Sequence, residues 1–189
     1  YVDILTGRAV AGKRVAIVGA GGIGFDVAEF LTHDGESPAE NLDLWKEEWG
    51  VSDPGKHRGG LAPEGASPAP SPRKVTLLQR KAERPGKRLG KTTGWIHRTS
   101  LMRKGVKMMG GTDYVLIDRH GLHVTTSDGP ALIECDTVVL CAGQEPERRL
   151  RSALEGRGVE VHVIGGADVA AELDAKRAID QGARLAAGL

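Results

Sequence analysis

Three glycines at the spacing G-x-G-x-x-G form the strongest chemical pattern in the sequence, within Gly19-Ala-Gly-Gly-Ile-Gly24. In this pattern the first glycine permits a tight turn, the second lets the backbone approach a pyrophosphate, and the third lets a helix pack closely on a strand. The free N–H groups at the start of that helix can then bind phosphate oxygens. Gly19, Gly21 and Gly24 hold these positions. The pattern predicts dinucleotide binding, and an ordinary tight turn is the alternative interpretation.

A basic pair ends the next expected strand, in the sequence Gln79-Arg80-Lys81. NAD-selective folds carry an acidic residue there to bind the ribose 2′-OH, whereas an arginine suits the 2′-phosphate of NADP. Arg80 can hold a phosphate with two N–H groups, and Lys81 adds a compact charge. Because no carboxylate ends this strand, we expect NADPH to be preferred over NADH, with a solvated basic edge as the alternative.

Other residues that could do chemistry do not form recognised sites. Cys135 and Cys141 are too far apart for a C-x-x-C redox pair and lie on expected strands, which disfavours a dithiol–disulfide reductase. The six histidines show no metal-binding spacing, and no G-x-S-x-G elbow occurs. Asp168 follows Gly165-Gly166, where it could cap the last helix. The sequence predicts neither a catalytic residue nor a metal site in this chain.

The elements around the glycine turn predict an α/β, Rossmann-like fold. A short β-branched run at 15–18 indicates a buried strand before the turn, and a helix is expected at 25–33 with Val27, Ala28, Phe30 and Leu31 inward. Further strands are expected at 75–78, 106–109, 114–118, 122–126, 131–133, 137–141 and 161–164, and helices at 41–49, 95–104 and 170–187. The expected inward residues of two of these helices are Leu42, Trp45 and Trp49 at 41–49, and Leu173, Ala178, Ile179 and Leu185 at 170–187.

Composition and spacing suggest how the chain is organised. Residues 34–72 exceed the loop that a βαβ unit needs, so we interpret them as an insertion, and residues 1–13 as a connector. The chain begins at Tyr1 rather than Met, which leads us to expect a piece of a longer polypeptide. Glycine accounts for 27 of 189 residues, about twice its usual share of roughly 7%.

Charge and hydropathy exclude several classes of protein. Hydrophobic residues make up 40% of the chain, and 26 Lys and Arg balance 25 Asp and Glu, so we expect a globular protein with no general attraction to nucleic acid or membranes. The basic stretch 87–98, with Trp95, fits a phosphate-facing edge as well as an RNA surface. No apolar run approaches the roughly 18 residues of a membrane span, and we expect a cytoplasmic protein.

Five stretches together resemble the C-terminal part of bacterial NADPH-dependent 2,4-dienoyl-CoA reductases, which are old-yellow-enzyme-like NADH:flavin oxidoreductases. These stretches are residues 14–26, 78–81, 90–98, 141–146 and 172–182. The resemblance extends through nearly the whole chain, including the insertion. It implies a three-layer FAD/NAD(P)-binding fold with a central parallel sheet and a small antiparallel meander.

The resemblance also implies an architecture. Members of this family have an N-terminal flavin barrel with FMN and the acyl-CoA site, then a 4Fe-4S cluster, then an FAD/NADPH module. Residues 14–143 would be the NADPH-binding domain, and residues 144–189 the closing segment of the FAD-binding domain. FMN, the cluster, the acyl-CoA site and the rest of the FAD-binding domain would lie outside this chain, which we expect to be inactive alone and to hold only part of an FAD site.

Site residues follow from the matching positions. The resemblance implies that the NADPH pyrophosphate would be bound by Gly19, Gly21, Gly22, Ile23 and Gly24. Its 2′-phosphate would be bound by Arg80 and Lys81, with Lys91 or Arg98 as weaker candidates. Near the nicotinamide would lie Ala142, Gly143 and Gln144, and the FAD ribityl chain would be bound by Asp168 with the N–H of Val169.

The expected activity of the intact enzyme is hydride transfer from NADPH to FAD, which supports reduction of 2,4-dienoyl-CoA in unsaturated fatty acid β-oxidation. Two alternatives remain. One is the same architecture with another substrate, as in an amine dehydrogenase or an enoate reductase. The other is an NADPH-binding module without catalytic activity.

Overall fold

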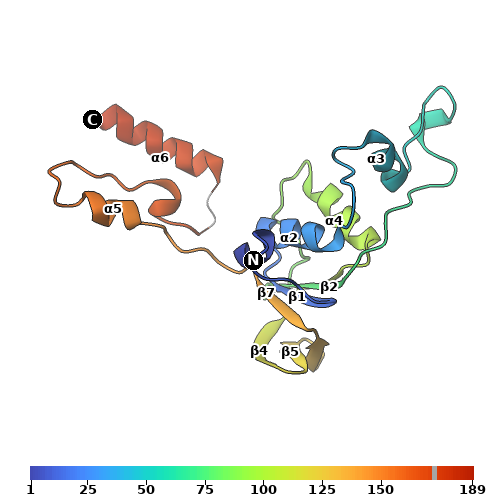
Figure 1. The fold of residues 1–189 in the computed structure, drawn as a ribbon. Helices are drawn as coiled ribbons and strands as arrows, with labels where there is room; N and C mark the ends of the chain where they lie inside the picture. The colour runs from blue at the N-terminus through green and yellow to red at the C-terminus, as the bar shows by residue number, and fades with distance from the viewer. Residues whose placement is uncertain (172–173) are drawn as a thin grey trace. The chain divides into compact units, whose positions relative to one another are not determined.

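The structure of the chain is a computed structural model that describes residues 1–171 and 174–189 (Figure 1). It comprises two units, Tyr1–Ala142 and Gly143–Leu189. The boundary lies one residue from the one expected at 143/144, while the assignment of the units to an NADPH-binding and an FAD-binding domain stays a prediction. None of the described helices is long and apolar enough to cross a lipid bilayer.

A parallel sheet of four strands forms the centre of the first unit (Figure 1). Its order is β3-β2-β1-β7, with bounds Lys107–Met109, Lys74–Leu78, Arg14–Val18 and Thr137–Leu140. Val15 of β1 pairs with Val75 of β2 on one side and with Thr137 of β7 on the other. All residues of β1 after Arg14 are buried, because both faces of this central strand are covered.

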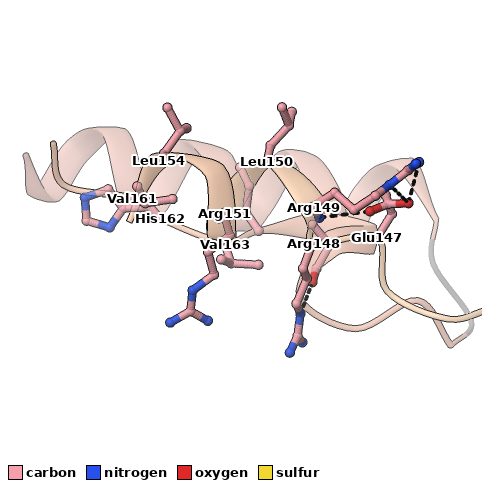
Figure 2. Close-up of a pocket in the computed structure, with 11 residues that line it drawn as sticks. Glu147, Arg148, Arg149, Leu150, Arg151, Leu154, Val161, His162 and Val163 are labelled. Atoms are coloured by element: carbon pink, nitrogen blue, oxygen red, sulfur yellow. Dashed lines mark hydrogen bonds and ion pairs between the residues drawn. The ribbon is translucent and has the colours of Figure 1, made fainter. Parts of the chain in front are cut away.

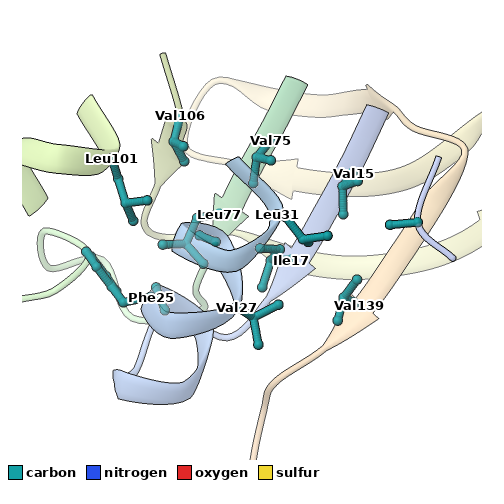
Figure 3. Packing of buried hydrophobic residues seen from close by; sticks show 13 residues of the cluster. Val15, Ile17, Phe25, Val27, Leu31, Val75, Leu77, Leu101, Val106 and Val139 are labelled. Atoms are coloured by element: carbon teal, nitrogen blue, oxygen red, sulfur yellow. The ribbon is translucent and has the colours of Figure 1, made fainter. Parts of the chain in front are cut away.

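Two different layers cover this sheet. Helices α2 (Gly22–Thr32) and α4 (Gly94–Arg103) pack in one hydrophobic cluster, and an antiparallel sheet of β4 (Asp113–Asp118), β5 (Gly121–Thr126) and β6 (Gly129–Glu134) packs in the other. Side chains alternate along a strand, so Val15 and Ile17 of β1 join the helical cluster (Figure 3). Ala16 and Val18 join the cluster of the antiparallel sheet. The predicted α/β Rossmann-like fold is confirmed.

The helices of the first unit lie close to their predicted ranges, with one error in α2. Val27, Ala28 and Leu31 are buried as predicted, but Phe30 is half exposed. Phe25 takes the inward position instead (Figure 3), and its ring lies against the backbone of Gly86. α4 ends just before Gly105, whose φ of +75° is the left-handed conformation that glycine permits.

The predicted insertion contains α3 (Leu42–Trp49), which begins at an Asn41 cap and ends at Gly50. Leu42 and Trp45 were predicted to face inward, but both are exposed. The helix instead contacts α4 through Trp49, whose ring centroid lies 4.8 Å from the Arg103 guanidinium. Glu48 is buried beside it, so polar contacts orient this helix. The rest of the insertion contains a short 3-10 helix, Arg58–Gly60, and an isolated antiparallel bridge between Val51 and Leu61. The expected connector contains α1, Val2–Leu5.

The second unit contains α5 (Arg149–Leu154), a 3-10 turn (Gly165–Ala167) and α6 (Ala175–Gly188). The strand predicted at 161–164 does not form, because a strand needs a neighbour and the described part of this unit contains none. The last helix starts later than predicted, because Asp174 caps it by accepting from the Arg177 N–H at 2.7 Å.

The inward face predicted for the last helix is also wrong where it can be described. Ile179 is largely exposed, and none of the described residues of α6 is buried. Ala178 and Leu185 are only partly covered. The prediction for Leu173 falls outside the described residues. α6 is therefore amphipathic in sequence, without a core beneath its apolar side among the described residues.

Candidate functional site

The glycine turn connects β1 directly to α2. Gly19 has a φ of +110°, and a Cβ at this position would lie 2.6 Å from the carbonyl oxygen of Cys141, at the end of β7. A Cβ on Gly24 would overlap the carbonyl oxygen of Gly19. Both positions therefore require glycine, the first for its backbone angle and the second for close packing of helix against turn.

The first turn of α2 offers unpaired donors. The N–H groups of Gly22, Ile23 and Gly24 precede the first intrahelical bond, which runs from the Phe25 N–H to the Gly21 carbonyl at 3.1 Å. A Cβ at Gly21 or Gly22 would meet no atom within 4 Å, so this side of the turn is open to a close ligand. The cradle and the positive end of the helix fit a pyrophosphate.

The turn also lies where the chain reverses its direction across the sheet. From β1 the chain proceeds to β2 and β3 on one side, and β7 returns on the other side. Ligands of open α/β sheets bind at such a switch point, outside the carboxyl ends of the strands. The Cys141 N–H donates to the Val18 carbonyl at 2.8 Å, which brings Ala142 beside Gly19. Ala142 ends the first unit, and Gly143, with a φ of +81°, and Gln144 begin the second.

Residues 79–83, which we call the basic-edge loop, follow β2 at the same edge of the sheet. Arg80 and Lys81 are exposed. Among the described residues Arg80 has no hydrogen bond or ion pair. Burial raises the pKa of the nearby Tyr114 phenol, and the positive charge of Arg80 partly opposes this shift. Arg80 is thus an exposed cation with its N–H donors available to an anionic ligand.

The other basic residues of this edge differ in their partners. Glu83 forms ion pairs with Lys87 at 3.3 Å and with Arg88 at 3.0 Å, and these partners lower the pKa of Glu83. Arg98 is partly buried, and its Nη1 donates to the Pro85 carbonyl at 2.5 Å. Burial, with a smaller effect of nearby charge, lowers the pKa of Arg98. Lys91 is exposed. Of the two weaker candidates, Arg98 therefore already supports the local backbone.

In the second unit the predicted FAD contacts take part in internal hydrogen bonds. The Asp168 carboxylate accepts from the Gln181 side chain at 3.1 Å, and the Val169 N–H donates to the Gly165 carbonyl at 3.1 Å. Asp168 does not cap the last helix, because Asp174 does. The carboxylate keeps further capacity to accept hydrogen bonds, whereas the Val169 N–H is occupied.

A cavity of about 620 Å³ lies within the second unit, between α5 and the extended segment before the 3-10 turn (Figure 2). Its three arginines are already paired: Arg149 with Glu147 at 2.8 Å, Arg151 with Glu155 at 2.6 Å, and Arg148 with backbone carbonyls. Leu150, exposed on its rim, and other aliphatic side chains line the remainder. The cavity therefore offers an apolar surface rather than a charged ligand site.

The two cysteines are free thiols. Cys135 is buried on the side of the antiparallel sheet, and burial raises its pKa. Burial also raises the pKa of the Cys141 thiol, to about 11. Both thiols are therefore protonated near neutral pH, and neither has the character of a reactive thiolate.

Sequence reasoning missed three residues of this region. Gln79 organises the basic-edge loop, Gly110 packs against that loop from β3, and the carbonyl of Cys141 contacts the glycine turn. The Gly110-Gly111 pair after a predicted strand was the available signal for a close backbone approach.

Comparison with known proteins gives a family match. A model of the pyridine nucleotide-disulphide oxidoreductase family matches residues 3–178. A metal reductase of Desulforamulus reducens is 28% identical over 165 residues, which are 87% of this chain and 23% of that protein.

Two solved structures share the fold across nearly the whole chain. The complex of 2-naphthoyl-CoA reductase with 2-naphthoyl-CoA has a TM-score of 0.65 and 21% identity, covering 96% of this chain and 22% of that one. Histamine dehydrogenase from Rhizobium sp. 4-9 has a TM-score of 0.64 and 18% identity, and the match covers 98% of this chain and 25% of that one. The chain thus spans about a quarter or less of the length of these relatives.

Proposed function

The chain belongs to the pyridine nucleotide-disulphide oxidoreductase family, and from that premise we propose that it is the NADPH-binding part of a larger flavin oxidoreductase. It is an NAD(P)/FAD-binding domain by fold and family. The proposal adds the choice of nucleotide, the residues that bind it and the reaction of the whole enzyme.

One observation carries the choice of nucleotide: an exposed arginine, and no carboxylate, lies two residues after the strand beside the glycine turn. Gly19 begins the turn after β1, and Arg80 follows the end of β2, which pairs with β1 in parallel. The carboxyl ends of the two strands therefore lie at one edge of the sheet. An arginine there suits the 2′-phosphate that distinguishes NADPH from NADH.

In this proposal each group has one task. The N–H groups of Gly22, Ile23 and Gly24 bind the pyrophosphate, and Arg80 with Lys81 binds the 2′-phosphate. Lys91 would add charge at this edge. When bound, NADPH supplies a hydride for reduction of a flavin.

We propose that the second unit contributes to an FAD site. The Asp168 carboxylate would accept hydrogen bonds from ribityl hydroxyl groups, beside Val169. Ala142, Gly143 and Gln144 would line the crossing near the nicotinamide. The apolar cavity of the second unit and the exposed face of α6 support a site completed by other parts of the enzyme.

The proposed reaction of the whole enzyme is NADPH-dependent reduction of 2,4-dienoyl-CoA, with FMN and a 4Fe-4S cluster in other parts of the polypeptide. Similarity to a reductase whose complex contains a CoA ester supports this class of substrate. Similarity to histamine dehydrogenase favours an amine as the second candidate. Turnover of each substrate by the intact enzyme separates the two.

Calorimetric titration of the chain with NADPH and NADH tests the choice of nucleotide. We expect tighter binding of NADPH, and loss of that preference in Arg80→Ala, because charge-assisted hydrogen bonds are worth about 1.5–3 kcal/mol, or roughly 10- to 150-fold in Kd. The affinity for NADH in Arg80→Ala is the matched control and should not change. If the wild type bound both nucleotides with equal affinity, the proposed preference for NADPH would be wrong.

A further inference from the structure

Gln79 makes four hydrogen bonds at the carboxyl end of β2. Its backbone N–H donates to the Met109 carbonyl at 2.9 Å, and its backbone carbonyl accepts from the Thr112 N–H at 3.0 Å. Its side-chain Nε2 donates to the carbonyl of Lys81 at 3.0 Å and to that of Glu83 at 2.6 Å. One residue therefore closes the basic-edge loop and also fixes it to the turn between β3 and β4.

The same two carbonyls also lie close to the Gly110-Gly111 turn, which carries no side chains. A Cβ at Gly110 would lie 2.5 Å from the Glu83 oxygen and 3.0 Å from the Lys81 oxygen. The N–H of Gly111 donates to the Lys81 carbonyl at 2.9 Å. The path of the basic-edge loop is thus set by contacts with Gln79 and with the Gly110-Gly111 turn.

The chemistry of the Gln79 side chain suits this role. A glutamine amide nitrogen carries two N–H donors, and here two carbonyl oxygens accept from it. A glutamate at the same position would offer only acceptors to two carbonyls that are acceptors themselves. In NAD-selective folds an acidic side chain in this region binds the ribose, whereas Gln79 is committed to its own loop.

We propose that Gln79 is a positioning residue that determines selectivity for NADPH, because it holds the backbone on both sides of Arg80 in one conformation before the nucleotide binds. This inference rests on the proposed function. Binding a phosphate with a mobile loop costs the entropy of ordering that loop, so a loop held in advance binds more tightly. NADH has no 2′-phosphate, so its affinity does not depend on the conformation of this loop.

Gln79→Met tests the inference, because it keeps the length of the side chain and removes both donors. We expect the Kd of NADPH to rise by about tenfold, from two lost hydrogen bonds, while the Kd of NADH stays unchanged. Hydrogen exchange of the Gly111 N–H, which donates to Lys81, should become faster without any nucleotide. Thr126→Val is the matched control: it removes two 3.2 Å hydrogen bonds of the β5–β6 turn, one donated to the Gly129 carbonyl and one accepted from the Asp128 N–H, and should change neither Kd.

Gly110→Ala gives a second test that does not depend on how well Gln79→Met folds. Its methyl group would displace the same two carbonyls by steric contact, and it should produce the same selective loss of NADPH binding. An unchanged NADPH affinity in Gln79→Met overturns the inference, as does an equal loss for both nucleotides, which would mean a purely structural role. If the wild type shows no preference for NADPH, the proposed function fails, and this inference fails with it. That result would hold even if the loop became looser in the variant.

Discussion

Gly24→Ala is the most direct perturbation of the packing that builds the glycine turn. The added methyl would overlap the carbonyl oxygen of Gly19 and lie 3.3 Å from Leu77 Cδ1. A backbone carbonyl in a turn cannot rotate away as a side chain can. α2 must therefore move away from the turn, and the buried contacts of Val27 and Leu31 loosen with it.

The expected cost follows from overpacking. Inserting a methyl into a closely packed position destabilises by about 1–3 kcal/mol. Gly22→Ala is the matched control on the same helix, because its methyl would meet no atom within 4 Å. Replacing that glycine should stabilise the chain by about 0.4–1 kcal/mol through reduced entropy of the unfolded state. The two variants should differ by roughly 1.5–4 kcal/mol in free energy of unfolding.

Urea unfolding followed by tryptophan fluorescence measures this difference. All three tryptophans lie in the first unit, at positions 45, 49 and 95, so the signal reports that unit. If Gly24→Ala were as stable as the wild type, or if Gly22→Ala lost as much stability as Gly24→Ala, the close approach of α2 to the turn would be wrong.

Two further predictions concern charged residues. Burial opposes ionisation of Asp136, but hydrogen bonds, first from the Arg14 N–H at 3.0 Å, lower its pKa below the reference value of 3.8. Its contribution to stability is therefore present above that value and is lost as pH falls through the folded-state pKa, so acid titration of Asp136→Asn should show a smaller loss of stability than the wild type. Glu48→Gln should destabilise by about 3 kcal/mol in urea unfolding, because Lys104, 3.4 Å away and 9% exposed, loses the negative charge that compensates its own. The double variant Glu48→Leu, Lys104→Met should recover most of that loss; failure to recover would contradict a desolvation cost.

The glycine turn and the strands of the first unit could be predicted because their signals are local. A β-branched run followed by G-x-G-x-x-G specifies strand, turn and helix within twenty residues. The sequence does not reveal which residues of β1 face which layer, because both faces of the strand are buried and apolar. The structure places Ile17 in the cluster with the helices and Val18 in the cluster with the antiparallel sheet.

Errors arose where a tertiary partner decides the outcome. The run Val161-His-Val-Ile164 has strand composition, yet no strand pairs with it among the described residues. Amphipathic periodicity predicted the inward face of α3, but Glu48 is buried there through Lys104, a partner 56 positions away in the sequence. The role of Gln79 depends on the β3–β4 turn about 30 residues later, which no local pattern reveals.

Chemical-shift mapping of the ¹⁵N-labelled chain on addition of NADPH would show directly whether the glycine turn binds the pyrophosphate. We expect the largest shifts at the N–H groups of Gly22, Ile23 and Gly24, together with Arg80 and Lys81. With NADH the N–H groups of Gly22, Ile23 and Gly24 should shift again, whereas those of Arg80 and Lys81 should shift much less. Shifts confined to the second unit, or absent from Gly22–Gly24, would contradict a pyrophosphate site at this turn.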